Sequence, residues 1–283
     1  MVQGTMDKEM PYIDDNLARL HEAASEYAVA VNSAITERFK GAHPYPLAGG
    51  ALYRLQADTL SFHEAVFALC VTGYVSCCAP LLRTQLDLLL STAIIVHRRE
   101  EAEIRGFRCT HFFLKATFVR NDTDAQLREH SRQQIEFGIA RLNPADQEKA
   151  RQFVFKDRLS AYWYAPDYYH RPQEAADKLL HEDMASYYAT LSSAAHGGFF
   201  GLGLFRDQPD AIHPNTRDDP RAQALALCTS TRIVLDQANA RDRFELGGQL
   251  SHTYDNLVEQ LSKIPPSYTP PIPIFPDQNF QSR

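Results

Sequence analysis

Apolar residues recur every three to four positions along most of the chain, which is the spacing of one face of an α-helix. The pattern predicts a first helix over residues 12–40, and its apolar face carries Leu17, Leu20, Ala24, Tyr27, Val31, Ile35 and Phe39. Pro44, Pro46 and the Gly49–Gly50 pair follow directly. Because proline and glycine interrupt helices, these residues predict a loop.

Two further helices are predicted over residues 51–72 and 74–98, and both are apolar around most of their circumference. Helices of this kind lie at the centre of a protein. Pro80 fits only a first turn, so the second helix is expected to begin nearer Cys78. Outside this hairpin, helices are predicted over 107–118, 124–141, from 143, and over 173–196, 220–240 and 244–263. With no alternating strand pattern, the fold class is an all-α, multi-helix bundle around a central apolar hairpin.

The chain divides into three regions: an N-terminal helix and loop (1–50), a main helical bundle (51–263) and a proline-rich C-terminal tail (264–283). The tail contains the sequence PPSYTPPIPIFPDQNFQSR, which favours an extended polyproline conformation. One interpretation is a spacer that lies along the domain surface or tethers a partner copy. The other is a segment that binds an aromatic groove.

Charge and cysteine content exclude several classes of function. A net charge of -6 gives no overall attraction for nucleic acid, so RNA binding would need a local basic patch. The five cysteines are odd in number and show no C-x-x-C spacing, which favours free thiols in a reducing compartment. The N-terminus has no apolar signal segment, so we expect a cytoplasmic protein. Ala65–Leu82 is 18 residues without a charge, but its Gly73 and Pro80 favour a buried hairpin over a membrane span.

Two pairs of polar residues interrupt otherwise apolar helices. Arg83 and Asp87 are four residues apart and therefore share a helix face, as do Ser192 and His196. If the two helices pack together, an interior cluster of a guanidinium, a carboxylate, a hydroxyl and an imidazole results. Such a cluster is either a functional site or a hydrogen-bonded network that fixes helix register.

The segments LLRTQLDLLLSTAIIV and YYATLSSAAHGG resemble the R-x-x-x-E helix and the Y-x-x-x-S-x-x-x-H-G segment of a widespread bacterial helical family of uncharacterised function, often grouped loosely with HEPN-type domains. The resemblance covers about residues 51–200 and includes Trp163. It implies a site formed by Arg83, Asp87, Tyr188, Ser192 and His196. Asp87 departs from the family pattern, which has Glu, and this shortens the reach of the carboxylate by one methylene.

HEPN ribonucleases as a class place His four to six residues after Arg, and three pairs here have that spacing: Arg38 with His43, Arg105 with His111, and Arg206 with His213. In a chain with 11 His, such pairs are expected by chance. Only Arg105 and His111 fall on a predicted helix. The H-E-x-x-H zinc motif is absent, because Phe67 stands four residues after His63, and no nucleotide or cofactor motif is found. We therefore expect neither a metal nor a cofactor.

Two functions remain open. In the first, a homodimeric HEPN-like protein acts on RNA in stress or phage defence, with His196 as acid or base, Arg83 stabilising phosphate charge, and Tyr188 and Trp163 binding the ligand. In the second, the protein is a non-catalytic interaction or ligand-sensing module, and the same cluster is structural. The aromatic segment around Trp163 fits either, since aromatic side chains stack on bases and also seal the edge of a core.

Overall fold

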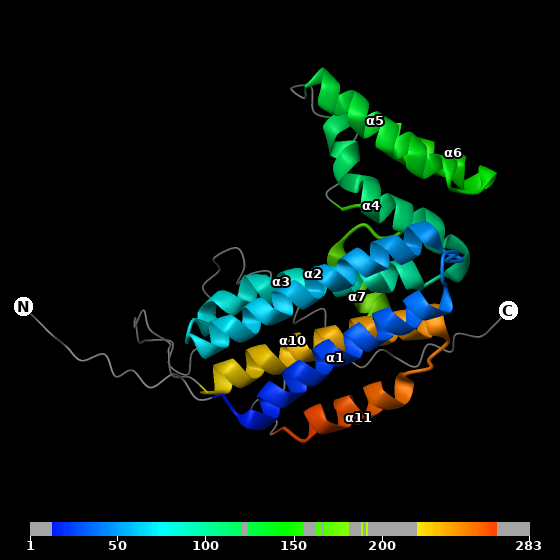
Figure 1. The fold of residues 1–283 in the computed structure, drawn as a ribbon. Helices are drawn as coiled ribbons and strands as arrows, with labels where there is room; N and C mark the ends of the chain where they lie inside the picture. Colours follow the sequence, from blue (N-terminus) through cyan, green and yellow to red (C-terminus); the bar gives the residue numbers. More distant parts are fainter. Residues whose placement is uncertain are drawn as a thin grey trace, which may run out of the picture.

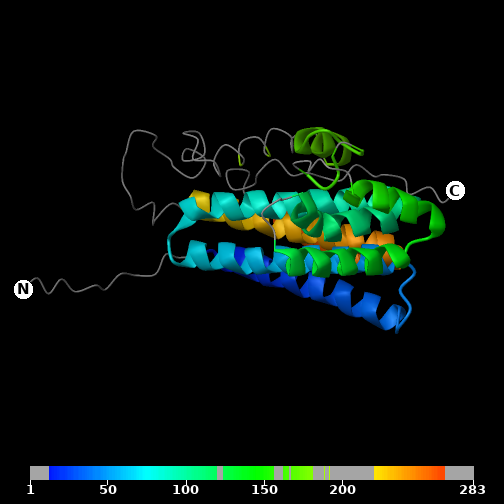
Figure 2. The ribbon, with the colours of Figure 1, turned by 90° about the horizontal axis from the view of Figure 1, so that it is seen from above.

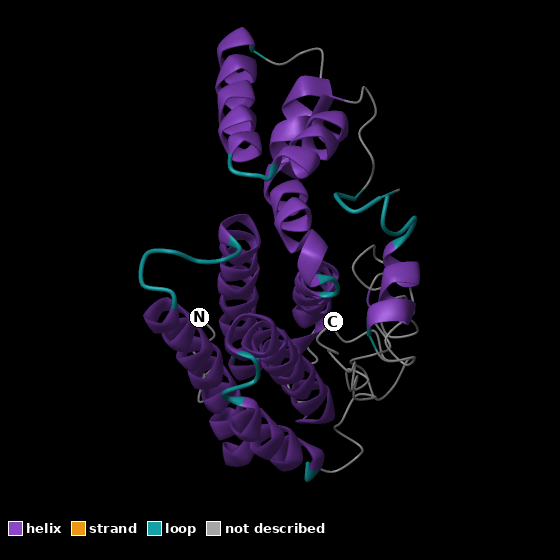
Figure 3. Cartoon of the chain, turned by 90° about the vertical axis from the view of Figure 1, so that its right-hand side faces the viewer, coloured by secondary structure: helices purple, strands orange, loops and turns teal. Residues whose placement is uncertain are grey.

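The computed structural model describes residues 13–119, 124–155, 162–165, 167–180, 188, 191 and 220–264. These residues form helices and no strand (Figure 3), which confirms the predicted all-α bundle. The helices are α1 (Asp15–Arg38), α2 (Pro46–Val71), α3 (Cys78–Val96), α4 (Ala102–Val119), α5 (Ala125–Ala140), α6 (Pro144–Phe155), α7 (Pro172–Leu179), α10 (Pro220–Arg241) and α11 (Ser251–Ser262).

The bundle is built around three helices, because α10 packs against both helices of the α2–α3 hairpin (Figures 1 and 2). From Ala222 to Arg241, every residue of α10 is buried except the half-buried Leu225. α1 and α11 cover the outer side of α10. The sequence did not single out α10 as central, because it carries many polar side chains. Several of those side chains form hydrogen bonds inside the bundle, which makes their burial tolerable: Gln223, Arg232, Asp236, Gln237 and Arg241.

α2 begins at Pro46, five residues before the predicted start, so the predicted loop ends earlier than expected. Proline suits the first turn of a helix, where its missing N–H has no intrahelical role. The next two amides, of Leu47 and Ala48, donate to Oε1 of Glu103 at 3.0 and 2.9 Å. The carboxylate of Glu103 in α4 therefore caps the N-terminus of α2. Gly49 and Gly50 lie within this helix and not in the predicted loop.

The uncharged stretch Ala65–Leu82 is not one continuous helix. α2 ends at Val71, Gly73 takes a left-handed conformation (φ +78°), and α3 begins at Cys78, where it was expected. Among the described helices, α3 is the one whose length and composition would allow it to cross a membrane, and 61% of its most apolar 18-residue stretch is buried inside the bundle. This burial is consistent with the core helix of a soluble protein.

α4, α5 and α6 form a three-helix arm that projects from the bundle (Figures 1 and 3). α4 joins the arm to the bundle by packing along α2, and α5 and α6 pack on α4. The arm has its own small core, formed by Ile104, Phe107, Ile135, Ile139, Ala150 and Phe153 with Leu47 of α2. The arm is therefore a distinct layer with a separate apolar centre.

Two other helix boundaries differ from the predictions. The helix predicted over 173–196 is interrupted, because α7 ends at Leu179 and Leu180 is extended (φ -115°, ψ 171°). Tyr188 and Leu191 are again helical and buried. The last helix begins at Ser251 rather than 244, since Gly247 and Gly248 both have positive φ and turn the chain back after a π-helical turn at Asp242–Leu246.

Candidate functional site

A row of three polar side chains follows one side of α3. Arg83, Asp87 and Ser91 are spaced by four residues, so they lie one above another on the helix surface. Each contacts a residue from a distant part of the chain: Arg83 and Asp87 contact Tyr188, and Ser91 contacts Trp163. α3 therefore supplies the rigid side of the candidate site.

Arg83, Asp87 and Tyr188 form a closed set of interactions, here called the Arg83 cluster. The guanidinium of Arg83 pairs with Oδ2 of Asp87 and donates a hydrogen bond to the hydroxyl of Tyr188. The Tyr188 hydroxyl in turn donates to Oδ1 of Asp87 at 2.6 Å. The guanidinium carbon also lies 3.5 Å from the centroid of the Tyr188 ring, a cation–π contact. The three side chains thus fasten the segment at residue 188 to α3.

The cluster lies at the boundary between core and solvent. The Arg83 side chain is 13% exposed and the Asp87 side chain is 46% exposed, whereas Tyr188 is buried. Burial and the hydrogen bond to Asp87 both raise the pKa of the Tyr188 phenol. Tyr188 therefore stays neutral at physiological pH and acts as a hydrogen-bond donor, not as a proton acceptor.

Trp163 closes the neighbouring edge of the bundle. Its Nε1–H donates to Oγ of Ser91 at 3.2 Å, and the side chain is buried. The indole packs edge-on against Tyr164, and Tyr164 stacks on Tyr162, each with ring centroids 5.4 Å apart. Burial and the charge of Asp87 raise the pKa of Tyr164, so this phenol is neutral as well. The aromatic segment here covers the core, and the polar edge of Trp163 is already hydrogen-bonded.

The structure brings together three of the residues that the sequence singled out, namely Arg83, Asp87 and Tyr188. Ser192 and His196 lie outside the described residues. The contact between the two motif segments is thus made by the tyrosine, which the sequence assigned to ligand binding.

The spacing of Arg105 and His111 has a structural explanation in the arm. Arg105 donates to Oε2 of Glu101 and to the carbonyl oxygen of Ile94. His111 hydrogen-bonds through Nδ1 to the carbonyl oxygen of Phe107 at 2.9 Å and packs against Gly138 of α5. Each of the two side chains therefore makes its own structural contacts, and these contacts involve different partners.

A buried His–Ser pair was missed by sequence reasoning, which considered His63 only as part of an incomplete zinc motif. Nδ1 of His63 lies 2.7 Å from Oγ of Ser230, and both side chains are fully buried. The geometry resembles that of a nucleophile and its base, but no substrate reaches a sealed pair. A histidine in an apolar helical run was the available signal, but its partner in α10 is 167 residues away.

Among the described residues, no group of three or more His, Cys, Asp or Glu side chains is arranged to hold a metal ion. Comparison of the chain with family models, with curated proteins and with solved structures finds no match. The function is therefore inferred from the geometry of the Arg83 cluster and from the surfaces of the bundle.

Proposed function

We propose that this protein is a non-catalytic helical interaction module, in which the Arg83 cluster is a structural clamp between two parts of the chain. One observation carries the proposal: the charged and hydroxyl groups of the cluster pair with one another, and the Nε and Nη1 atoms of Arg83, which make no hydrogen bond, are buried. The guanidinium of Arg83 forms an ion pair with Asp87, a hydrogen bond with the hydroxyl of Tyr188 and a cation–π contact with the ring of Tyr188. Such a network fixes helix register and keeps buried charge compensated.

The competing hypothesis, chemistry on RNA, makes different demands on the same residues. An arginine that stabilises a phosphate has to direct its N–H groups at that phosphate. Here the carboxylate of Asp87 already pairs with the guanidinium of Arg83, and its negative charge repels a polyanion. The net charge of -6 adds no compensating attraction. These features support the structural interpretation of the cluster.

The arm offers a surface for the proposed interaction. Phe113 of α4 is 80% exposed, Phe137 of α5 is 67% exposed, and Leu127 of α5 is 54% exposed. Aromatic side chains such as these two phenylalanines are enriched in association surfaces. We propose that a second copy of the chain binds here, which gives a homodimer. The five free thiols suit a reducing compartment, and we place the protein in the cytoplasm.

The proposal is tested with variants that each remove one side chain or one chemical group of the cluster. Arg83→Ala is expected to lower the stability by about 2 kcal/mol, since it leaves Asp87 and Tyr188 without their partner. Tyr188→Phe keeps the ring and removes the hydroxyl, so a loss of about 1 kcal/mol is expected. Arg132→Ala is the matched control, because Arg132 pairs with Glu129 on the surface and both side chains are at least half exposed.

The same variants separate the two functions. Thermal melting and an RNA cleavage assay are run on the wild type, Arg83→Ala and His196→Ala. A clamp requires a lower melting temperature for Arg83→Ala and no RNA cleavage by any of the three proteins. Cleavage by the wild type that both variants lose, with unchanged melting temperatures, would establish the RNA-directed function and overturn the proposal.

A further inference from the structure

α11 fills only part of the groove between α1 and α10. α10 has 22 residues and α11 has 12 residues. At about 1.5 Å per residue the two helices are about 33 and 18 Å long, so about 15 Å of α10 extends beyond α11. The chain reverses at Gly247 and Gly248 before α11 begins, so α11 runs antiparallel to α10 and ends beside its N-terminal half (Figure 1). The part of α10 that α11 does not cover is its N-terminal half, whose side chains from Ala222 onward are buried by other parts of the protein except for the half-buried Leu225.

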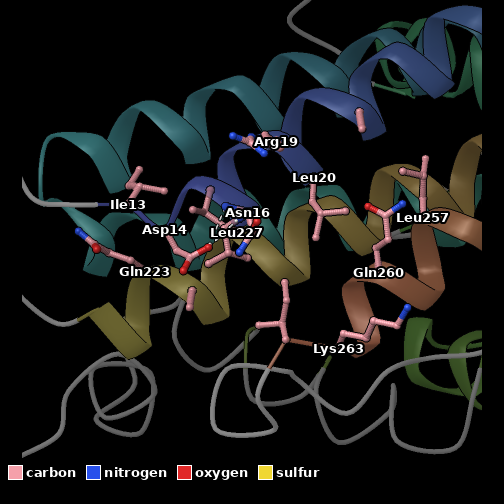
Figure 4. A pocket seen from close by; sticks show the side chains of 14 residues that line it. Ile13, Asp14, Asn16, Arg19, Leu20, Gln223, Leu227, Leu257, Gln260 and Lys263 are labelled. Atoms are coloured by element: carbon pink, nitrogen blue, oxygen red, sulfur yellow. Dashed lines mark hydrogen bonds between the residues drawn. The ribbon is translucent and has the colours of Figure 1, made fainter.

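A cavity of about 750 Å³ lies where α11 ends (Figure 4). Its apolar wall comes from all three helices and from the residues that follow α11, namely Leu17, Leu20, Ala224, Leu227, Leu257 and Ile264. Gln260 and Lys263 lie at the edge on the α11 side. Asp14, Asn16, Arg19 and Gln223 supply further polar groups to the lining. The cavity is therefore a continuation of the groove that α11 occupies, with an apolar wall and polar groups beside it.

The chain itself leads into this cavity. α11 ends at Ser262, and the next two residues, Lys263 and Ile264, line the cavity. The 19 residues that follow, 265–283, lie outside the described residues and begin with PPSYTPPIPIF. A polyproline segment advances about 3.1 Å per residue, so about five residues cover the uncovered 15 Å. Tyr268 is the first large side chain within that distance.

We propose that residues 265–271 of the same chain continue along the groove beyond α11 and fill this cavity, with Tyr268 as the anchoring side chain. Proline-rich segments lose little conformational entropy on docking, because their backbone is already restricted. Attachment at Ile264 gives the segment an effective concentration in the millimolar range, which favours it over the tail of another copy or a free ligand at micromolar concentration. The tyrosine supplies an apolar ring and a hydroxyl that can remain at the polar edge.

Photocrosslinking in the full-length protein tests this placement. Tyr268 is replaced by p-benzoyl-L-phenylalanine, the protein is irradiated, and the linked peptides are identified by mass spectrometry. Crosslinks to Leu20, Ala224 or Leu227 within a single chain are expected. The control places the same photoreactive residue at Phe280, beyond the predicted reach, and its yield to these residues is expected to be at least about fivefold lower. Ala224→Arg, which fills the cavity, is expected to reduce the Tyr268 crosslink by a similar factor.

A second measurement uses the dye 1-anilinonaphthalene-8-sulfonate, whose fluorescence rises in apolar cavities. Tyr268→Ala in the full chain is expected to increase dye fluorescence several-fold over the wild type, and Tyr268→Ala with Ala224→Arg is expected to cancel the increase. Three outcomes overturn the proposal: no crosslink to the cavity residues, crosslinks only between two chains, or equal dye fluorescence in the wild type and Tyr268→Ala. The second outcome assigns the cavity to a partner copy, and the third leaves it open to a small ligand.

Discussion

Nδ1 of His63 lies 2.7 Å from the hydroxyl of Ser230, at a place where neither side chain is exposed to solvent. Nε2 of the same ring lies 3.2 Å from the carbonyl oxygen of His21. A carbonyl oxygen only accepts, so Nε2 carries the proton and Nδ1 accepts from the serine. The ring of His21 stacks on His63 with centroids 3.7 Å apart. The neutral imidazole is therefore fully satisfied, and a second proton would add a buried charge.

This arrangement predicts a loss of stability in acid. Burial and the neighbouring His21 lower the pKa of His63 from 6.5 to about 3. Protons then bind the unfolded chain more readily than the folded one, so this contribution is fully present above about pH 6.5 and decreases as the pH falls toward 3. The free energy of unfolding is expected to fall by about 1.4 kcal/mol per pH unit across this window from His63 alone. Urea unfolding at about pH 7 and about pH 4.5 measures the change.

The contribution of His63 is isolated by His63→Asn, which is expected to be less stable at neutral pH but to lose less stability on acidification. His252→Gln serves as the control, since His252 is exposed on α11. An unchanged slope with pH in His63→Asn would assign the acid sensitivity to other groups, of which His21 and His111 also have pKa values lowered by burial.

Two glycines are predicted to respond to alanine in opposite directions. A Cβ at Gly106 of α4 would lie 2.5 Å from Cα of Ala48 and 2.6 Å from its backbone nitrogen, so Gly106→Ala would push α4 away from α2. A loss of about 2 kcal/mol is expected from this overpacking. At Gly50 no atom lies within 4 Å of the new Cβ, and Gly50→Ala is expected to stabilise α2 by about 0.5–1 kcal/mol. Equal effects of the two substitutions in urea unfolding would contradict the close approach of α4 to α2.

The buried pair Arg241–Glu245 is predicted to be needed as a pair. Nε of Arg241 lies 2.8 Å from Oε2 of Glu245, and the guanidinium also donates to Asn32 and Gln56. Arg241→Ala leaves the carboxylate buried with His43 as its remaining partner, so a loss of about 3–5 kcal/mol is expected. Arg241→Met combined with Glu245→Gln removes both charges, and this double variant is expected to be more stable than Arg241→Ala alone. A double variant that is less stable than Arg241→Ala in chemical denaturation would refute the argument.

The proposed dimer is predicted to depend on the arm. Phe113→Asp and Phe137→Asp place a charge on the exposed apolar side chains of α4 and α5 and are expected to convert a dimer into monomers, while the melting temperature of each monomer stays within a few degrees of the wild type. Tyr53→Asp on α2 is the control, because Tyr53 is 58% exposed but lies outside the arm. Size-exclusion chromatography with light scattering measures the mass. A wild type that is monomeric at all concentrations, or a dimer that survives both arm substitutions, would overturn the proposed dimer interface on the arm.

Part of the candidate site follows from the sequence. The spacing of Arg83 and Asp87 places both on one face of α3, and this needs only the helical period. Tyr188 could be named because it belongs to the segment that resembles a known motif. Its contact with Arg83 could not be derived, because residues about 100 positions apart meet only when the bundle closes. For the same reason, the sequence did not predict the hydrogen bond between Trp163 and Ser91 or the pair formed by His63 and Ser230.

By itself the sequence determined the helical class, the apolar α2–α3 hairpin and most helix positions, since these depend on periodicity and on proline and glycine within a few residues. Only the tertiary structure decided that α10 is buried, that Glu103 caps α2, and that the groove beyond α11 is apolar. The physical reason is that a polar side chain such as Arg241 or Glu245 is stable in the interior only when a distant group compensates it. Local sequence does not contain the position of that group.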